Sequence, residues 1–267
     1  MKIFETHAHF DDECYDEDRE ELIEAMLGSE GIIDTIVNVG ASLKGCKDSV
    51  RLASKYEKIY AAIGLHPEEI LGLSDEIFDW IKNTAMSNEK IVAIGEIGLD
   101  YHYDEPPKQA QKEAFKRQLI LASDINKPVI IHSRDACLDT LDILKDTHDS
   151  SGEHVYKSGG IIHCYSYSKE SAIDFLNLGY HIGVGGVVTF KNSKKLKEAL
   201  DVIPLDRLLL ETDSPYMAPE PHRGTRNDSR NIRYVAEKIA ELKNTTAQEI
   251  IDITNMNARK LFGIKNL

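Results

Sequence analysis

The chain has 267 residues, a formal net charge of −13 and four cysteines. The length suits one large α/β domain, and no apolar run approaches the roughly 20 residues that a membrane-spanning helix needs. The cysteines form no C-x-x-C pair, which argues against a disulfide framework and a cysteine-rich zinc site. The acidic charge excludes a protein that grips a long stretch of nucleic acid through a basic surface.

An apolar strand pattern starts almost at Met1, and two histidines follow it directly. This leaves no room for a removable secretory leader, which needs a basic start, an apolar stretch and a cleavage site. We therefore expect a cytoplasmic protein with no membrane association and no obligate protein partner.

Short apolar runs alternate with amphipathic, charged segments along the chain. The apolar runs predict strands over residues 2–7, 35–40, 59–65, 91–97, 128–132, 160–163, 180–185 and 207–212. Helical patterns include residues 16–27, 46–56, 108–126, 169–178, 193–202, 229–242 and 247–262. This alternation is typical of a parallel sheet, and several runs are apolar throughout, as strands covered on both faces should be.

Eight strand–helix units predict an α/β fold, a (β/α)8 TIM barrel that forms a single domain over residues 1–267. An open doubly wound sheet is the structural alternative. That fold more typically has a Gly-rich phosphate loop after its first strand. Here His-Ala-His follows the first strand and no G-x-G-x-x-G occurs, so the closed barrel is preferred.

Two histidines end the first predicted strand. His7 and His9 are two positions apart, and the period of a strand points both side chains the same way. Together they can bind one metal ion. Taken alone, however, this pattern is more often a pair of satisfied polar residues.

Histidines and carboxylates also stand where four later strands end. Glu96, His132, His163 and Asp213 follow the apolar runs of the fourth, fifth, sixth and eighth strands. In a barrel these ends converge on the face where barrel enzymes place their chemistry. Buried polar groups need partners, and a metal centre supplies them. The alternative is an extended hydrogen-bond network of six polar side chains.

Six ligands suit two metal ions better than one, because one carboxylate can bridge two cations about 3.5–4 Å apart. Imidazole with carboxylate favours Zn, Mn, Fe or Co over Mg, although supply in the cell also decides the metal. The expected cofactor is therefore two divalent ions, Zn, Mn or Mg. Glu96 is the expected bridge between one ion on His7, His9, Glu96 and Asp213 and another on Glu96, His132 and His163.

Six short motifs occur in order at the strand ends. They are His7-Ala-His9, Gly64-Leu-His66-Pro67, Gly95-Glu96-Ile-Gly-Leu-Asp100-Tyr101, His132-Ser-Arg134, His163-Cys-Tyr-Ser166 and Glu211-Thr-Asp213-Ser-Pro215. From residue 6 to about residue 230 the series resembles that of the TatD family of amidohydrolase-like metallohydrolases. The resemblance implies a barrel, divalent metals and phosphodiester hydrolysis, often as a 3′-to-5′ deoxyribonuclease. It also implies that the family's metal ligands match His7, His9, Glu96, His132, His163 and Asp213, the same six residues.

Three segments depart from the family pattern. Residues 223–229 read Arg-Gly-Thr-Arg-Asn-Asp-Ser, where family members often read Arg-Gly-Lys-Arg-Asn-Glu-Pro. Ser166-Tyr167 replaces a usual Ser-Gly, and Glu5 stands where the family usually has Asp. These changes leave the predicted ligands in place and bear on substrate preference.

Three residues outside the predicted ligands are candidates for substrate binding. His66 ends the third strand and could contact substrate or protonate a leaving oxygen, or it could stabilise the turn before Pro67. Arg134 and Arg223 could each hold a phosphate, since a guanidinium forks onto its oxygens, or each could form a salt bridge instead. Residues expected to lie beside the ligands, and in part to orient them, are Asp100, Tyr101, Cys164 and Glu211.

The predicted reaction is hydrolysis by a water whose pKa is lowered by metal, with Asp213 and Glu96 as catalytic residues and Asp213 as proton acceptor. The expected substrate is nucleic acid, DNA or RNA, bound at its end, where an acidic protein needs few phosphate contacts. One alternative is ester or amide hydrolysis, as in an aminoacyl-tRNA deacylase or a cyclic amidase. Cyclic amidase barrels often bridge their metals with a modified lysine on strand four, where this chain has Glu96. The other alternative is a non-catalytic metal-binding scaffold, against which the complete ligand set argues.

Overall fold

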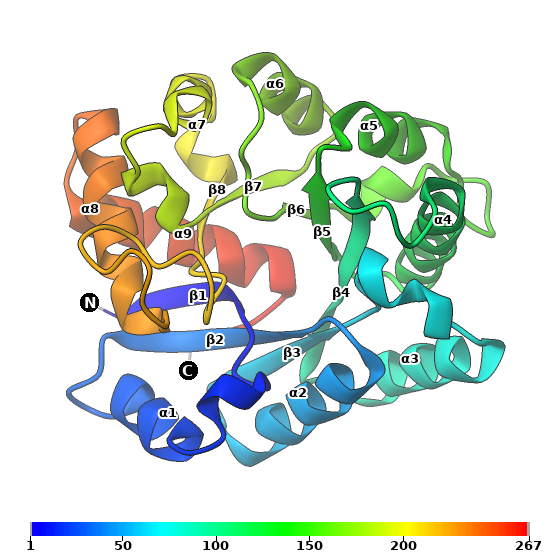
Figure 1. The fold of residues 1–267 in the computed structure, drawn as a ribbon, viewed down its shortest axis with the longest axis horizontal. Helices are drawn as coiled ribbons and strands as arrows, with labels where there is room; N and C mark the ends of the chain where they lie inside the picture. Colours follow the sequence, from blue (N-terminus) through cyan, green and yellow to red (C-terminus); the bar gives the residue numbers. More distant parts are fainter. Residues whose placement is uncertain (1, 266–267) are drawn as a thin grey trace.

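The structure is a computed structural model that describes residues 2–265, so positions 1, 266 and 267 of the predicted domain lie outside the described residues. Eight parallel strands form one sheet in the order of the chain (Figure 1). Each predicted strand is present. Their bounds are β1 Ile3–Ala8, β2 Ile33–Gly40, β3 Ile59–Ile63, β4 Ile91–Asp100, β5 Val129–Arg134, β6 Gly160–Ile162, β7 His181–Val184 and β8 Leu208–Leu210.

The first and last strands meet just beyond the end of β8, and the sheet becomes a nearly closed barrel. A parallel bridge joins Ala8 to Ser214. The backbone N–H of Asp213 donates to the carbonyl of His7 at 2.9 Å, and that of His9 donates to the carbonyl of Ser214 at 2.7 Å. The prediction of a (β/α)8 barrel is confirmed, and the open-sheet alternative is wrong.

Helices follow the strands and cover the outside of the barrel (Figure 1). Several begin at a serine or threonine whose hydroxyl accepts a backbone N–H, as Ser42, Ser74 and Thr246 do. Two helices, α3 and α5, add to those predicted. The helices are α1 Arg19–Leu27, α2 Leu43–Lys55, α3 Asp75–Ser87, α4 Lys108–Asp124, α5 Cys137–Asp146, α6 Lys169–Asn177, α7 Lys194–Leu200, α8 Ile232–Lys243 and α9 Ala247–Phe262. Short 3-10 turns include η2 Pro67–Gly72 after β3 and η4 Gly186–Thr189 after β7.

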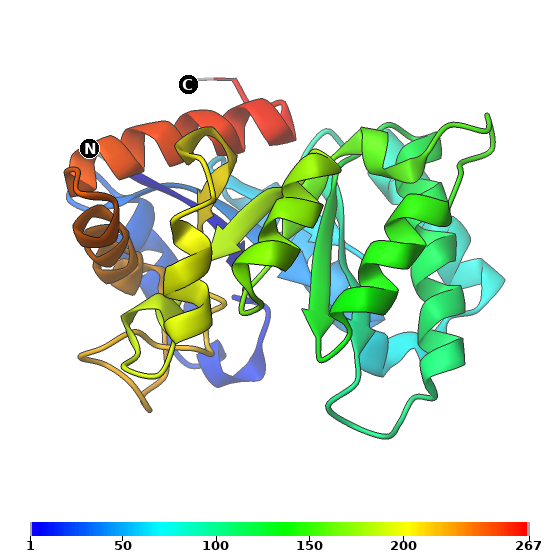
Figure 2. The ribbon, with the colours of Figure 1, turned by 90° about the horizontal axis from the view of Figure 1, so that it is seen from above.

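Two hydrophobic clusters hold the fold together. The larger joins the strands to the surrounding helices. The smaller contains no buried residue of α1–α8, so it fills the interior of the barrel. Helix α9 closes that interior at the amino-terminal ends of the strands, where Phe262 stacks on Phe4 with ring centroids 6.1 Å apart. Figure 2 shows α9 lying across one end of the barrel, which leaves the carboxyl ends of the strands for the site.

Among residues 2–265, no helix combines the length and apolar character that crossing a membrane would require.

Candidate metal centre

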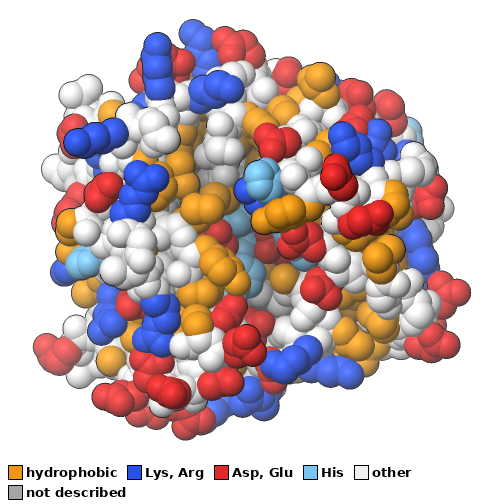
Figure 3. Space-filling model, in the orientation of Figure 1, with side chains coloured by type: hydrophobic (Ala, Val, Ile, Leu, Met, Phe, Trp, Pro, Cys, Tyr) orange, Lys and Arg blue, Asp and Glu red, His pale blue; other side chains and the backbone are white. Residues whose placement is uncertain are grey.

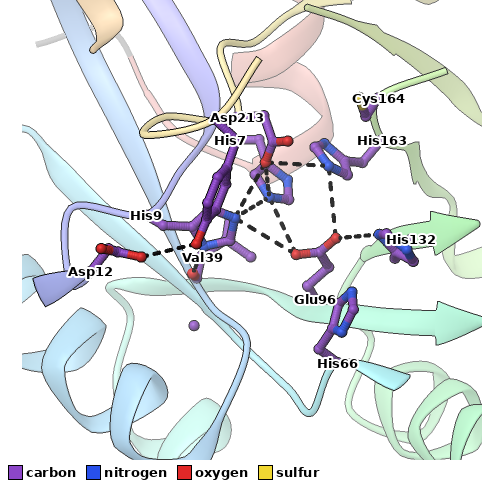
Figure 4. A network of polar contacts seen from close by, with 12 residues as sticks. His7, His9, Asp12, Val39, His66, Glu96, His132, His163, Cys164 and Asp213 are labelled. Atoms are coloured by element: carbon purple, nitrogen blue, oxygen red, sulfur yellow. Dashed lines mark hydrogen bonds and ion pairs between the residues drawn. The ribbon is translucent and has the colours of Figure 1, made fainter. Parts of the chain in front are cut away.

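His7 and His9 converge at the end of β1, as the strand period predicts. Their Nε2 atoms lie 3.0 Å apart, and both side chains are nearly or fully buried. The Nδ1 of His9 lies 2.7 Å from the carbonyl oxygen of Val39 and donates its N–H there, which leaves Nε2 facing the centre (Figure 4).

Glu96, in the middle of β4, lies between two pairs of imidazoles (Figure 4). Its Oε2 is 3.5 Å from Nε2 of His7 and 3.7 Å from Nε2 of His9. Its Oε1 is 3.0 Å from Nδ1 of His132 and 3.7 Å from Nε2 of His163. Each carboxylate oxygen thus faces its own pair of ring nitrogens.

Asp213 stands opposite Glu96, just beyond β8. Its Oδ1 lies 3.8 Å from Nε2 of His7, 3.4 Å from Nε2 of His9 and 3.6 Å from Nε2 of His163. The residue adopts a left-handed backbone with φ of 57°, which turns the side chain toward the imidazoles. The structure therefore brings all six predicted ligand residues together.

Two carboxylates orient the remaining histidines from outside the cluster. Oδ2 of Asp100 lies 2.9 Å from Nε2 of His132 and accepts its N–H. Oε1 of Glu211 lies 3.2 Å from Nδ1 of His163, an ion-pair contact without the alignment of a hydrogen bond. Both carboxylates lie beside a predicted ligand, as expected, and Asp100 also orients its histidine by a hydrogen bond. Tyr101, by contrast, turns away and donates its hydroxyl to Asp139 at 2.7 Å.

The buried carboxylates dominate the electrostatics of the centre. Burial by itself raises the pKa of Glu96, but His7 and the neighbouring imidazoles outweigh it and hold that pKa well below its usual range. The pKa of Asp213 is lowered in the same way against the effect of burial. Burial lowers the pKa of His9, yet Asp213 and Glu96 outweigh it and raise that pKa to about 10. Both carboxylates are ionised at neutral pH, so the centre needs positive charge on its imidazoles or from a cation.

The residues present fit divalent ions. Ligand atoms within 4.8 Å of one another occur in the groups His7–His9–Asp213 and Glu96–His132–His163. Imidazole nitrogen and carboxylate oxygen are common ligands of zinc and other first-row metals. Hydrogen bonds to the outer nitrogens of His9 and His132 hold the inner nitrogens toward the centre, as ligand histidines require.

Of the three predicted substrate-binding residues, His66 and Arg134 lie beside residues of this centre, and Arg223 stacks on a neighbouring loop. The ring of His66 packs edge-on against His132 with centroids 4.4 Å apart, while its Nδ1 accepts the N–H of Glu68 and begins η2. His66 thus stabilises the turn and also faces the centre. Burial lowers the pKa of His66 to about 4, so its ring is neutral.

Neither predicted arginine forms a close salt bridge with a carboxylate. Nη1 of Arg134 is 3.9 Å from Oδ2 of Asp100, and its half-exposed guanidinium lies 5.7 Å from the ring centre of Tyr103. Arg223 lies over the ring of Phe190 at 4.2 Å. It has no carboxylate within ion-pair distance among residues 2–265.

Sequence reasoning missed several groups that shape the centre. The carbonyl of Val39 orients His9, and a backbone oxygen leaves no signal in the sequence. In the sequence, Glu5 stands out only as a departure from the family pattern. Its buried carboxylate accepts the N–H of His7 at 3.1 Å and the N–H and hydroxyl of Thr212 at 3.0 and 2.7 Å, which ties β1 to the turn after β8.

Cys164 was expected near the site, and it lies beside His163 and Asp213. Its N–H donates to Oε1 of Glu211 at 2.6 Å. Burial raises the pKa of its thiol well above the usual range, so the sulfur stays protonated and is a weaker ligand than the imidazoles around it.

Comparison with known proteins assigns the chain to a family. Residues 4–263 match the family described as TatD related DNase. The metal-dependent hydrolase YabD of Bacillus subtilis is 45% identical over 262 residues, which cover 98% of this chain and 99% of that protein. YcfH of Escherichia coli K12, also named a metal-dependent hydrolase, is 36% identical, with 99% and 97% covered. The crystal structure of the Escherichia coli TatD homolog YJJV superposes with a TM-score of 0.89 at 31% identity, with 98% of each chain covered. This chain belongs to the TatD family of metal-dependent hydrolases.

Proposed function

We propose that this chain hydrolyses phosphodiester bonds at the 3′ end of single-stranded DNA, with two divalent ions, Zn, Mn or Mg, held by the six clustered residues. We propose that this hydrolysis takes place in the cytoplasm. One observation carries the proposal: the two oxygens of Glu96 face separate pairs of imidazoles, His7 with His9 and His132 with His163. A carboxylate placed in this way is suited to bridging two cations.

Asp213 is the proposed proton acceptor. Its side chain is 14% exposed, compared with 5% for Glu96, so it is the more accessible of the two carboxylates. Its lowered pKa keeps it ionised and able to take a proton from water at Oδ1. Divalent ions held at the centre would supply Lewis acidity and lower the pKa of that water.

Arg134 and His66 are the proposed contacts for the substrate phosphate and the leaving group. Arg134 is half-exposed beside Asp100, so its guanidinium can donate hydrogen bonds to the oxygens of an arriving phosphate without leaving its place. His66 is neutral and lies next to His132, where its ring can donate a hydrogen bond but carries no charge. The net charge of −13 favours a substrate that makes only a few local phosphate contacts, as a strand end does.

The test is hydrolysis of short single-stranded DNA labelled at its 5′ end, with Mg, Mn or Zn restored after chelation. We expect stepwise shortening that requires metal and is lost in Glu96→Ala. Glu237→Ala, which removes an exposed carboxylate from α8, should leave the products unchanged.

The alternatives give different results in the same assay. A protein that binds metal but cuts no DNA with any ion contradicts the nuclease proposal and directs the search to aminoacyl esters and cyclic amides. A non-catalytic scaffold would bind metal and convert none of these substrates, so Asp213→Ala would change no activity. Cleavage mainly within long duplex DNA would contradict action at a strand end.

A further inference from the structure

The catalytic face carries opposite charges on its two sides. Residues 11–21, which follow β1, include eight Asp or Glu and one Arg. Residues 190–197, which follow η4 and run into α7, include four Lys and no acidic residue. Figure 3 shows lysine and arginine side chains gathered over α7 and the neighbouring loop, and acidic side chains gathered over α1.

Hydrogen bonds hold the backbone of the basic side around Phe190. The carbonyl of Phe190 accepts from Nζ of Lys197 at 2.6 Å and from Oγ of Ser193 at 2.8 Å, and its N–H donates to Val187 at 3.0 Å. The guanidinium of Arg223 rests on the Phe190 ring at 4.2 Å. We call Phe190, Lys191, Lys195 and Arg223 the basic ledge.

Three cations of the basic ledge are free to meet an anion. Lys191, Lys195 and Arg223 are exposed, and none has a carboxylate within ion-pair distance in the described part of the chain. Other cations nearby are neutralised. Arg226 pairs with Asp18 at 2.5 Å, and Arg230 pairs with Asp228 at 2.8 Å.

The basic ledge lies on the same face of the barrel as the candidate metal centre. Its two segments follow β7 and β8, and Asp213 lies at the start of the second. The segments are in direct contact: the N–H of Glu220 donates to Oγ1 of Thr189 at 2.9 Å, and a Cβ at Gly186 would lie 2.0 Å from the carbonyl oxygen of Met217.

We propose that the basic ledge binds the phosphates of the strand that leads away from the cleaved end, on Lys191, Lys195 and Arg223. This rests on the proposed function and adds a direction to it. The strand leaves across α7, because the acidic segment 11–21 repels it on the other side. Phe190 holds Arg223 in place by cation–π contact.

The experiment measures binding without cleavage. A fluorescent single-stranded 12-mer with phosphorothioate linkages at its 3′ end is titrated with the manganese-loaded protein at several salt concentrations, beside a protected trinucleotide. Lys191→Gln/Lys195→Gln removes two cations from the basic ledge. Lys82→Gln/Lys116→Gln removes two exposed lysines from α3 and α4 and matches the change in net charge.

We expect the ledge variant to bind the 12-mer more weakly and to show a shallower salt dependence. Each phosphate neutralised on a single strand contributes about 0.7 to the slope of log K against log salt, so two lost contacts lower it by about 1.4. Equal slopes of log K against log salt for the two double variants would overturn the proposed role of the basic ledge. Equal affinity of the wild-type protein for the 12-mer and the trinucleotide would overturn it as well. Neither result depends on hydrolysis, so failure of the ledge and failure of the proposed nuclease activity are distinguishable.

Discussion

The carboxylate of Asp100 accepts the N–H of His132 at 2.9 Å, and this contact turns the other ring nitrogen of His132 toward Glu96, 3.0 Å away. Asp100 therefore fixes the tautomer and the orientation of a proposed ligand, and it does so at the ring nitrogen that points away from Glu96.

Asp100→Ala should weaken metal binding by about 10- to 100-fold, the usual cost of removing a carboxylate that orients a ligand histidine. Titration against a chromophoric chelator measures the affinity. Asp139→Ala is the control, because that carboxylate pairs with Lys112 and Tyr101 on the outside of the barrel. Equal affinities in Asp100→Ala and wild type would show that His132 is held by other contacts.

Gly98→Ala should destabilise the protein by roughly 3 kcal/mol, because the added methyl overpacks a strand that holds the centre. Gly98 has φ of 148°, and a Cβ there would lie 1.9 Å from the carbonyl oxygen of His132. Urea denaturation measures the loss. Gly72→Ala is the matched control, since nothing lies within 4 Å of its Cβ position. Similar midpoints for the two variants would contradict the argument.

Glu5→Ala should lower the free energy of unfolding by about 3 kcal/mol, because it leaves the buried N–H groups of His7 and Thr212 without an acceptor. Glu5→Gln keeps an acceptor at that position and should cost less. Both are compared with wild type by urea denaturation. An alanine variant as stable as the glutamine variant would show that this carboxylate does not hold β1 to the turn after β8.

His181 lies at the end of the barrel away from the candidate metal centre. It should make the free energy of unfolding depend on pH. Burial, with Arg207 nearby, lowers its pKa to about 4, whereas an unfolded histidine titrates near 6.5. Protonation therefore favours the unfolded chain. The stability that the neutral ring contributes is complete above about pH 6.5 and is lost as pH falls toward 4, by about 2 kcal/mol at pH 5.

The measurement is the difference in unfolding free energy between wild type and His181→Gln across this range. The wild type should lose stability relative to the variant as pH falls from 6.5 to 5. A difference that stays constant with pH would show that the ring is protonated equally in both states.

The sequence predicts the barrel and the six clustered residues because both follow from a repeated local pattern. Parallel strands carry their carboxyl ends to one face, so His7, Glu96 and His132 meet although they are far apart in the chain. Helices α3 and α5 are less evident from sequence. Helix α3 buries only Ile81 and Ala85 in 13 residues, and such a narrow apolar stripe gives a weak helical signal.

Other features depend on backbone geometry that residue patterns do not encode. Glu211 and Asp213 are two positions apart, a spacing that in a strand would point both side chains the same way, but β8 ends at Leu210 and Asp213 adopts a left-handed φ. Glu211 therefore reaches His163 from outside the cluster while Asp213 faces the imidazoles directly. The stacking of Arg223 on Phe190 likewise joins two loops that the sequence alone does not place together.

Glu96 is the proposed bridge between two divalent ions in one centre. The most direct test is to count bound metal per chain, by elemental analysis after equilibrium dialysis against Zn or Mn, in wild type and in Glu96→Gln. We predict two ions per wild-type chain and fewer than two in the variant, because the amide retains the shape of the side chain but only one good ligand oxygen. One ion per wild-type chain, or two in both proteins, would contradict the bridging role of Glu96.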